Sequence, residues 1–253
     1  WYRDGRPDEP GGKRIRPLLL LLAVEAAGGH WREALPAAAA VELIHNFSLI
    51  HDDVQDRSDT RRGRPTVWVR WGDAQAINAG DAMFSLAHLA FPRLLPAYPA
   101  DRVLQAVQML DETCLRLTGG QFQDLSFENY PAVSLEQYRG MIAGKTGALI
   151  ACSARMGGLL GGASPAQLIA WDEFGRFLGE AFQIWDDWLG IWGDAALTGK
   201  SAESDLSSGK KSYPVCIGLE QSPRFRAHWQ QGPVTLGEVP GLARILEEDG
   251  VKG

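Results

Sequence analysis

Apolar residues along this 253-residue chain recur mostly at three- and four-residue spacing, the pattern typical of amphipathic helices. The clearest run begins at Ser164-Pro165, where a capping residue precedes a proline suited to the first helical turn, and it continues to Leu189. Residues 37–53 and 101–118 carry the same periodicity. No alternating strand pattern bounded by hairpin turns stands out, so the chain is predicted to be all-α.

Glycine pairs mark the expected breaks between helices, at positions 28–29, 119–120 and 161–162, with a further break at Gly232-Pro233. None of these breaks is a long linker, so we predict one domain over residues 1–253. The chain opens at Trp1 rather than a methionine, and the helical pattern Leu242 to Glu248 has no obvious end. We therefore expect the sequence to be shortened at both termini.

Composition narrows the class of protein. With 45% hydrophobic and 22% charged residues the chain is globular, and a net charge of −6 without a long Lys/Arg run argues against a nucleic-acid partner. The longest apolar stretch, Leu18 to Val24, is too short to be a transmembrane segment. The three cysteines have no zinc or redox spacing, which favours reduced thiols and a cytoplasmic location.

Two acidic clusters follow apolar stretches. In the segment HDDVQD at 51–56, Asp52 and Asp56 would lie one helical turn apart and repel each other. A solvated acidic face is the ordinary reading of such a pattern, but the apolar residues just before it place it at the end of a core helix. Mg²⁺, which prefers carboxylate, water and phosphate oxygens, would neutralise it. Asp186-Asp187 is expected to end a second strongly apolar helix, so we expect two acidic walls of one cavity.

Basic residues supply a counterpart to these carboxylates. They occur beside glycines at 11–16, 61–63, 145–147, 199–200 and 209–211. Each of them alone is more often a surface charge than a ligand. Together with two aspartate pairs they indicate diphosphate binding, because guanidinium forks and lysine ammonium groups are common phosphate ligands.

Six motifs in order give the sequence a specific resemblance. They are GGKRIRP at 11–17, the Asp-rich segment with RRG at 52–63, GQFQDL at 120–125, KTG at 145–147, FQIWDD at 182–187 and GK…DL…GKKSYP at 199–214. Over nearly its whole length the chain resembles the trans-isoprenyl diphosphate synthase (polyprenyl synthetase) family, of the short-chain type that makes farnesyl or geranylgeranyl diphosphate. The resemblance implies a bundle of antiparallel helices around a central cavity, a homodimer, and Mg²⁺ as cofactor.

The resemblance also implies roles for individual residues. It assigns Mg²⁺ to Asp52, Asp56 and Asp186, with Asp53 and Asp187 in support. It assigns isopentenyl diphosphate to Lys13, Arg16, His45 and Arg62. It assigns the allylic diphosphate to Arg61, Lys145, Lys200 and Lys210, with Thr146 and Gln183 beside the developing cation.

The expected reaction joins isopentenyl diphosphate to an allylic diphosphate. Ionising the allylic C–O bond leaves a carbocation, and Mg²⁺ with fixed cations stabilises the departing diphosphate. Product length is expected to depend on Phe47 and Ser48, about one turn before Asp52. If the Phe47 ring forms the floor of the cavity and the small Ser48 leaves room beside it, the products should be all-trans C15–C20 diphosphates, with geranylgeranyl slightly favoured. The other reading of Phe47 is ordinary core packing.

One position departs from the family pattern. Gly190 stands where the last aspartate of the second motif is common, so Gly190→Asp is expected to shift half-saturation by Mg²⁺ to a lower metal concentration. Two other functions remain open. A non-catalytic subunit of a heteromeric synthase would not need the intact first aspartate cluster. A terpene cyclase, which binds one diphosphate, would not need the second basic site.

Overall fold

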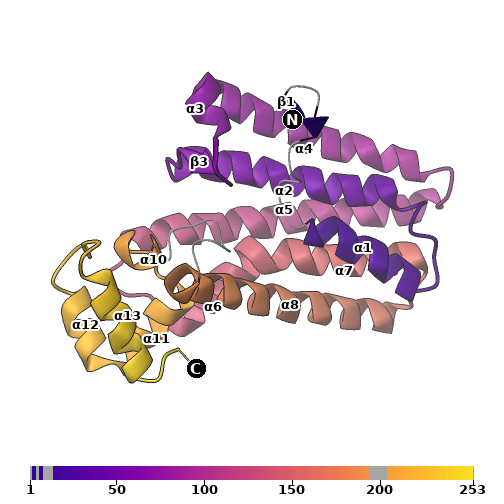
Figure 1. Cartoon of the computed structure of the whole chain (residues 1–253). Helices are drawn as coiled ribbons and strands as arrows, with labels where there is room; N and C mark the ends of the chain where they lie inside the picture. The colour runs from indigo at the N-terminus through magenta and orange to yellow at the C-terminus, as the bar shows by residue number, and fades with distance from the viewer. Residues whose placement is uncertain (1, 4–5, 8–13, 194–203, 253) are drawn as a thin grey trace. The chain divides into compact units, whose positions relative to one another are not determined.

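The computed structural model describes residues 2–3, 6–7, 14–193 and 204–252, and their secondary structure is almost entirely helical (Figure 1). The longer helices are α1 (Ile15–Ala26), α2 (Leu35–Gln55), α4 (Asp73–Ala90), α5 (Ala100–Glu128), α6 (Leu135–Ile142), α7 (Ala148–Gly161), α8 (Pro165–Trp192), α11 (Tyr213–Gln221) and α13 (Val239–Glu248). The shorter ones are α3 (Val67–Trp71), η1 (Phe91–Leu94), the π-helix η2 (Ala143–Gly147), α10 (Ser204–Ser207) and α12 (Pro223–Trp229). The predicted all-α class is confirmed.

The chain divides into two compact units. Unit 1 holds residues 1–114 and 149–175, and unit 2 holds residues 115–148 and 176–253. Helices α5 and α8 each contribute their first part to unit 1 and the rest to unit 2. The prediction of one domain around one cavity stays a prediction.

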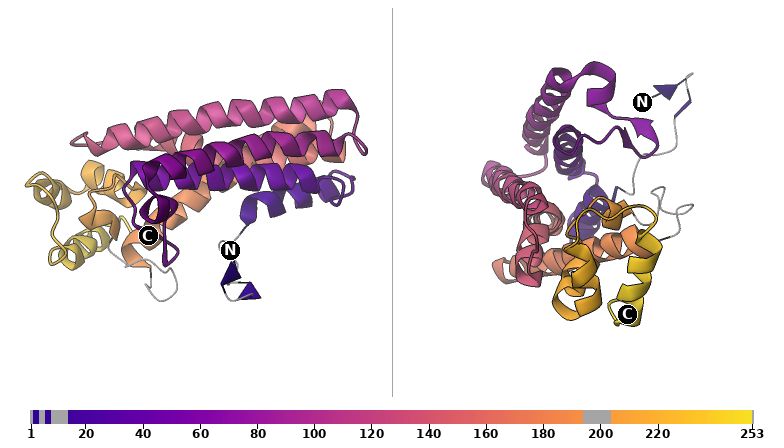
Figure 2. Two further views of the ribbon diagram at one scale, coloured as in Figure 1. Left: turned by 90° about the horizontal axis from the view of Figure 1, so that it is seen from above. Right: turned by 90° about the vertical axis from the view of Figure 1, so that its left-hand side faces the viewer.

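In unit 1, α2 and α4 run side by side over most of their length (Figures 1 and 2). The small buried residues Ala37, Ala40 and Val41 let α2 pack closely. Further along, the His51 ring lies against Gly80, where a Cβ atom would be 2.2 Å from His51 Nε2. His51 Nε2 is also 3.3 Å from the carbonyl oxygen of Ile77. This contact fixes the rotation of the α2 segment that carries the first aspartates.

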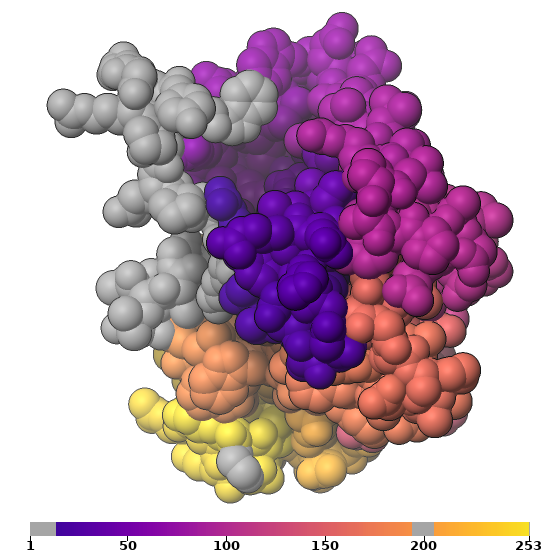
Figure 3. All heavy atoms as spheres, turned by 90° about the vertical axis from the view of Figure 1, so that its right-hand side faces the viewer, coloured from indigo at the N-terminus to yellow at the C-terminus, as the bar shows by residue number. Residues whose placement is uncertain are grey.

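Helix α1 packs on α7 through glycines (Figure 3, indigo against salmon). A Cβ at Gly157 would lie 2.3 Å from the carbonyl oxygen of Leu20, and a Cβ at Gly161 would lie 2.6 Å from that of Val24. Any side chain there would push α1 outward. The predicted break at 161–162 is confirmed, since α7 ends at Gly161 and Gly162 has φ 92°.

In unit 2, the C-terminal helices enclose a core of their own. Leu206, Val215, Phe225, Leu242 and Leu246 are at most 1% exposed. A second cluster gathers around the α6 residues Tyr138, Met141 and Ile142. Because Leu206 belongs to the first of these cores, the short helix α10 is anchored although it has only four residues.

The predicted break at Gly119-Gly120 is wrong, because α5 runs through both residues. A Cβ at Gly120 would lie 2.2 Å from the backbone nitrogen of Lys145, so this glycine permits a close contact between α5 and η2. Asp186-Asp187 does not end its helix either, since α8 continues to Trp192. The two predicted helix ends are wrong for the same reason. Local composition does not distinguish a glycine or aspartate that ends a helix from one that lies inside a helix and contacts another element.

Two short hairpins were not predicted. Strands β1 (Tyr2–Arg3) and β2 (Arg6–Pro7) pair, and β3 (Thr60–Arg61) pairs with β4 (Arg64–Pro65). Strands of two residues are too short to show an alternating pattern.

All three cysteines are free and buried. Among the helices that the structure describes, none combines the length and the apolarity needed to cross a membrane.

Candidate functional site

The first aspartate cluster lies at the C-terminal end of α2. Asp52 and Asp53 are in its last turn, and Asp56 follows as the capping residue, with its N–H donating to the carbonyl oxygen of Asp52 at 2.8 Å. Asp52 and Asp56 are therefore one turn apart, as predicted. The Asp53 carboxylate is only 6% exposed, and its burial raises its pKa, whereas nearby Arg61 lowers it.

Arg61 binds this cluster directly. Its Nε donates to Asp53 Oδ1 at 2.7 Å, and its Nη2 donates to Asp52 Oδ2 at 3.1 Å. The positive charge of Arg61, which lies in β3, thus balances the negative charge of the two carboxylates on α2. A divalent cation at Asp52 would compete with Arg61 for the same oxygen, and would leave guanidinium N–H groups for a phosphate. The assignment of Arg61 to the allylic diphosphate stays a prediction.

Arg62 occupies the tip of the β3–β4 hairpin in a left-handed conformation. Arg62 has φ 54° and Gly63 has φ 72°, the combination of a two-residue type I′ turn. A non-glycine residue in this region costs roughly 1 kcal/mol or more. Strained residues of this kind are concentrated at functional sites. Here the turn holds the exposed Arg62 side chain at the hairpin tip, directly after Arg61.

Three guanidinium groups converge on His45 in unit 1. Arg16 Nη1 is 3.4 Å from His45 Nε2. Burial, together with the positive charges of Arg16, Arg62 and Arg61, lowers the pKa of His45 to about 3. Burial also lowers the pKa of Arg16 to about 10, partly offset by Glu42. His45 is therefore a neutral hydrogen-bond partner inside a cationic cluster, an arrangement suited to a polyanion.

Arg16 has spare donor capacity. Its Nε atom is buried and has no hydrogen-bond partner among the described residues. A buried N–H without a partner is costly, so an anion that accepts from it would be stabilised. Lys13, the fourth residue assigned to isopentenyl diphosphate, lies outside the described residues.

The histidine gives a pH-dependent prediction. Since the folded pKa of His45 is about 3 and its ordinary value is 6.5, the unfolded chain binds the proton more readily. The stability that comes from keeping His45 neutral is fully present above pH 6.5. It is lost as the pH falls towards 3, where the free energy of unfolding drops by up to about 1.4 kcal/mol per pH unit. We expect His45→Gln to reduce the fall in unfolding free energy between pH 7 and pH 5, measured by urea denaturation. Equal falls in wild type and variant would contradict this, and the exposed His30→Gln serves as control.

In unit 2, η2 presents Lys145 and Thr146. A single π-turn joined to α-helices is frequent at functional sites. Lys145 Nζ donates to Asp124 Oδ2 of α5 at 2.5 Å, and Thr146 Oγ1 donates to Gln183 Oε1 of α8 at 2.6 Å. Gln183 Nε2 then donates to Asp187 Oδ1 at 2.9 Å. The structure therefore joins three predicted site residues, Thr146, Gln183 and Asp187, into one hydrogen-bonded chain.

Asp187 is the centre of this network. Its carboxylate is buried and accepts hydrogen bonds from the Tyr138 hydroxyl at 2.5 Å and the Tyr213 backbone N–H at 2.9 Å. Lys210 Nζ is 3.5 Å from Asp187 Oδ1. Burial and this carboxylate raise the pKa of Tyr138. Asp187 thus ties α6, α8 and α11 together, and its supporting role beside the half-buried Asp186 stays a prediction.

Lys210 lies among carboxylates. Burial lowers its pKa, but Asp187, Asp205, Asp124 and Asp186 outweigh that effect and raise it. The ammonium is therefore charged, and its assignment to the allylic diphosphate stays a prediction. Lys200, assigned to the same diphosphate, lies outside the described residues.

Sequence reasoning gave no role to four residues of this region. They are Asp124, Tyr138, Asp205 and Tyr213, which contact or surround the predicted lysines and Asp187. Asp124 and Asp205 stand inside quoted motifs, which was a usable signal. Tyr213 also stands inside a quoted motif, whereas nothing in the local sequence of Tyr138 distinguishes it from a core aromatic residue.

The carboxylates fit Mg²⁺ when phosphate oxygens complete its coordination. Within the described ranges, no three His, Cys, Asp or Glu side chains are grouped so as to hold a metal by themselves. Mg²⁺ commonly takes one or two carboxylates, several waters and substrate phosphates, rather than an all-protein cage. Asp52 with Asp56 in unit 1, and Asp186 in unit 2, match that donor set.

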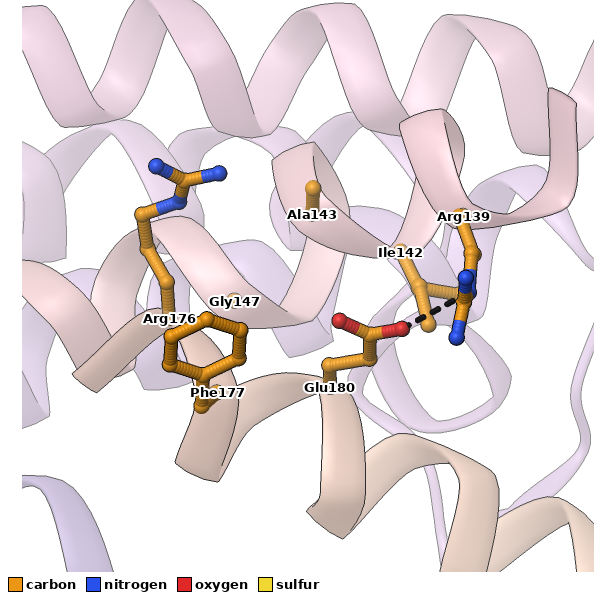
Figure 4. Close-up of a pocket in the computed structure, with 7 residues that line it drawn as sticks. All are labelled: Arg139, Ile142, Ala143, Gly147, Arg176, Phe177 and Glu180. Atoms are coloured by element: carbon orange, nitrogen blue, oxygen red, sulfur yellow. Dashed lines mark ion pairs between the residues drawn. The ribbon is translucent and has the colours of Figure 1, made fainter. Parts of the chain in front are cut away.

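A separate groove lies on unit 2 between α6, η2 and α8 (Figure 4). Its lining residues are Arg139, Ile142, Ala143, Gly147, Arg176, Phe177 and Glu180. Arg139 Nε is paired with Glu180 Oε1 at 2.8 Å across one end. None of the predicted site residues that the structure describes lines it, so it is distinct from the Thr146–Gln183–Asp187 network.

Comparisons with known proteins bear on the family of the chain. A family described as polyprenyl synthetase matches residues 8–239. The geranylgeranyl diphosphate synthase of Methanosarcina mazei is 42% identical over 242 residues, covering 96% of this chain and 74% of that protein. The (2E,6E)-farnesyl diphosphate synthase of Mycobacterium bovis is 47% identical over 221 residues, covering 85% of this chain and 60% of that protein.

The fold agrees as well. The crystal structure of a polyprenyl synthetase from Streptomyces coelicolor A3(2) superposes with a TM-score of 0.89 at 40% identity, covering 98% of this chain and 76% of that one. The chain therefore spans between about three fifths and three quarters of the proteins that it matches here. Motif order, fold and identity agree: the chain belongs to the polyprenyl synthetase family.

Proposed function

We propose that this chain is a Mg²⁺-dependent trans-prenyltransferase that condenses isopentenyl diphosphate with an allylic diphosphate. The expected product is an all-trans C15–C20 diphosphate, geranylgeranyl slightly favoured. The observation that carries the proposal is the convergence of Arg16, Arg61 and Arg62 on the neutral His45, on the helix that carries Asp52. Its relatives are named as farnesyl and geranylgeranyl diphosphate synthases.

In unit 1, the guanidinium groups would bind isopentenyl diphosphate. Arg16 offers a buried Nε–H that has no partner in the described part of the chain, and Arg62 offers an exposed fork at the hairpin tip. His45, being neutral, adds a hydrogen-bonding group without adding charge. Asp52 and Asp56 would hold Mg²⁺, which supplies charge stabilisation to the departing diphosphate.

In unit 2, Lys145 and Lys210 would bind the allylic diphosphate, and Asp186 would hold a further Mg²⁺. The Thr146 hydroxyl donates to the side-chain oxygen of Gln183, whose amide donates to Asp187. Both oxygens keep lone pairs that can face a developing carbocation. Because their orientation is fixed by the buried Asp187, they need not reorganise when the C–O bond breaks. The departed diphosphate would accept the proton that the new product loses.

Assembly and location belong to the same proposal. A homodimer and a cytoplasmic location are expected from the family resemblance. Neither is needed for the chemistry derived above, and sedimentation of the purified protein would test the first.

A turnover assay tests the function. Purified protein should release diphosphate only when isopentenyl diphosphate, an allylic diphosphate (dimethylallyl, geranyl or farnesyl) and Mg²⁺ are all present. EDTA should abolish the release. A cyclase would consume an allylic diphosphate without isopentenyl diphosphate and yield a hydrocarbon. A non-catalytic subunit would show no turnover with any starter, and either result would overturn the proposal.

A further inference from the structure

Ser58 joins helix α2 to the β3–β4 hairpin. Arg57, just before it, has the left-handed φ of 52°, at the position after a helix end that glycine usually occupies. The Ser58 N–H donates to the carbonyl oxygen of Asp53 at 3.0 Å, in the last turn of α2. The chain therefore leaves the first aspartate cluster in one fixed direction before the hairpin begins.

The carbonyl oxygen of Ser58 has two donors, both from residues that follow the hairpin. The Thr66 hydroxyl donates to it at 2.9 Å, and the Trp68 indole Nε1–H donates to it at 2.9 Å. Because a backbone carbonyl has two lone pairs, these donors fill its hydrogen-bonding capacity. The Thr66 N–H also donates to the carbonyl oxygen of Asp59 at 3.0 Å. Together these contacts close the hairpin at its base.

Thr66 makes its contact in place of a more common one. It directly precedes α3, and a threonine in that position usually accepts from a backbone N–H of the first helical turn. Within the described chain, the Thr66 side chain caps no N–H of α3. The residue is only 4% exposed, and its hydroxyl donates across the base of the hairpin. The Thr66 side chain thus serves the hairpin rather than the helix.

The hairpin has little stability of its own. Strands β3 and β4 have two residues each, and an isolated two-stranded hairpin is marginally stable in water. Arg61 and Arg64 are paired in its register, and like charges directly opposite each other destabilise a strand pair. At the tip, Arg62 adds a left-handed backbone with φ 54°. The position of the exposed Arg62 side chain therefore depends on the contacts at the base.

We propose that Thr66 and Trp68 are positioning residues for diphosphate binding, because their donors to the Ser58 carbonyl oxygen hold the β3–β4 hairpin where Arg62 can meet a diphosphate. This inference rests on the proposed function, since it concerns the isopentenyl diphosphate assigned to Arg62. Without one donor, only a fraction of the molecules has the hairpin in the binding position. The apparent Kd rises by the inverse of that fraction. Saturating substrate restores the position, so KM rises while kcat stays the same.

The test measures isopentenyl diphosphate binding by calorimetry in EDTA, without an allylic partner, so that no reaction occurs. Trp68→Phe keeps a ring beside the Arg57 guanidinium, now 5.3 Å from the indole centroid, but has no N–H. Thr66→Val keeps the shape of the side chain but has no hydroxyl. Each variant should weaken binding about three- to tenfold, the range for one lost hydrogen bond, and raise the KM for isopentenyl diphosphate equally at unchanged kcat. Thr66→Ser, which keeps the hydroxyl, should bind as wild type does, and amide exchange over 60–65 should quicken only in the two weak variants.

Thr113→Val is the matched control. Thr113 is also buried, and its hydroxyl donates to the Met109 carbonyl oxygen at 2.7 Å inside α5, so its loss should leave isopentenyl diphosphate binding unchanged. Unchanged binding in Trp68→Phe and Thr66→Val, or a lower kcat without a higher KM, would overturn the inference. If Thr66→Val does not fold, Trp68→Phe still decides. If wild type itself does not bind isopentenyl diphosphate, the proposed function fails, and this inference with it.

Discussion

Replacing Asp52 by alanine is expected to lower kcat/KM about a thousandfold or more, comparable to removing one strong electrostatic group from an active site. The reason is that Asp52 would hold the Mg²⁺ that stabilises the departing diphosphate. Stability should change little, because Arg61 keeps its 2.7 Å contact with Asp53 and a repelling neighbour is removed. Steady-state kinetics and thermal unfolding of the same preparation check both halves of this prediction.

Two further variants sharpen the test of Asp52. Asp52→Asn keeps the shape of the side chain but not its charge, so it should lose nearly as much activity as alanine. Asp73→Ala removes another arginine-paired aspartate, an exposed partner of Arg57 at 2.8 Å, and should keep wild-type turnover. Near-wild-type rates for Asp52→Ala would show that the metal assignment at α2 is wrong.

Replacing Phe47 by alanine is expected to shift the products towards longer prenyl chains. The Phe47 ring is half-buried and packs edge-on against Phe84 of α4, with centroids 5.4 Å apart, and against His51 at 4.9 Å. Ser48, in contrast, lies one turn before Asp52 on the same side of α2, and its hydroxyl is bonded to the carbonyl oxygen of His45 at 2.8 Å. A chain growing past Ser48 would therefore meet the Phe47 ring beside it.

Mass spectrometry of the prenyl diphosphate products measures the chain length for each variant. Ser48→Phe adds a ring on the side of α2 that carries Asp52, so it should shorten the products. Phe91→Ala truncates a ring that is 1% exposed and should cost roughly 3–5 kcal/mol of stability without altering product length. If Phe47→Ala behaves like Phe91→Ala, destabilised with an unchanged product series, Phe47 is core packing and the proposed floor is wrong.

Much of the helical framework could be predicted from sequence because its signals are local. The 3.6-residue periodicity located the cores of α2, α5 and α8, and the Ser164-Pro165 cap located the start of α8. The one-turn spacing of Asp52 and Asp56 followed from the same local geometry. The family resemblance was confirmed by the comparisons, although the roles that it implies for single residues remain predictions.

The contacts between elements distant in sequence could not be predicted. Gly120 and Gly190 look alike in sequence as helix-weakening residues, yet one admits the backbone of η2 and the other the carboxylate of Asp205. Arg61 donates hydrogen bonds to Asp52 and Asp53, and Tyr138 donates one to Asp187. No local sequence pattern predicts either pairing.

Sequence by itself thus determined the all-α class, the main helices and the family, because periodicity, caps and motif spacing act over a few neighbouring residues. Only the tertiary structure decided which carboxylate meets which cation and which glycine serves packing. Such contacts depend on the close approach of segments tens of residues apart, and that approach is set by the packing of the whole unit.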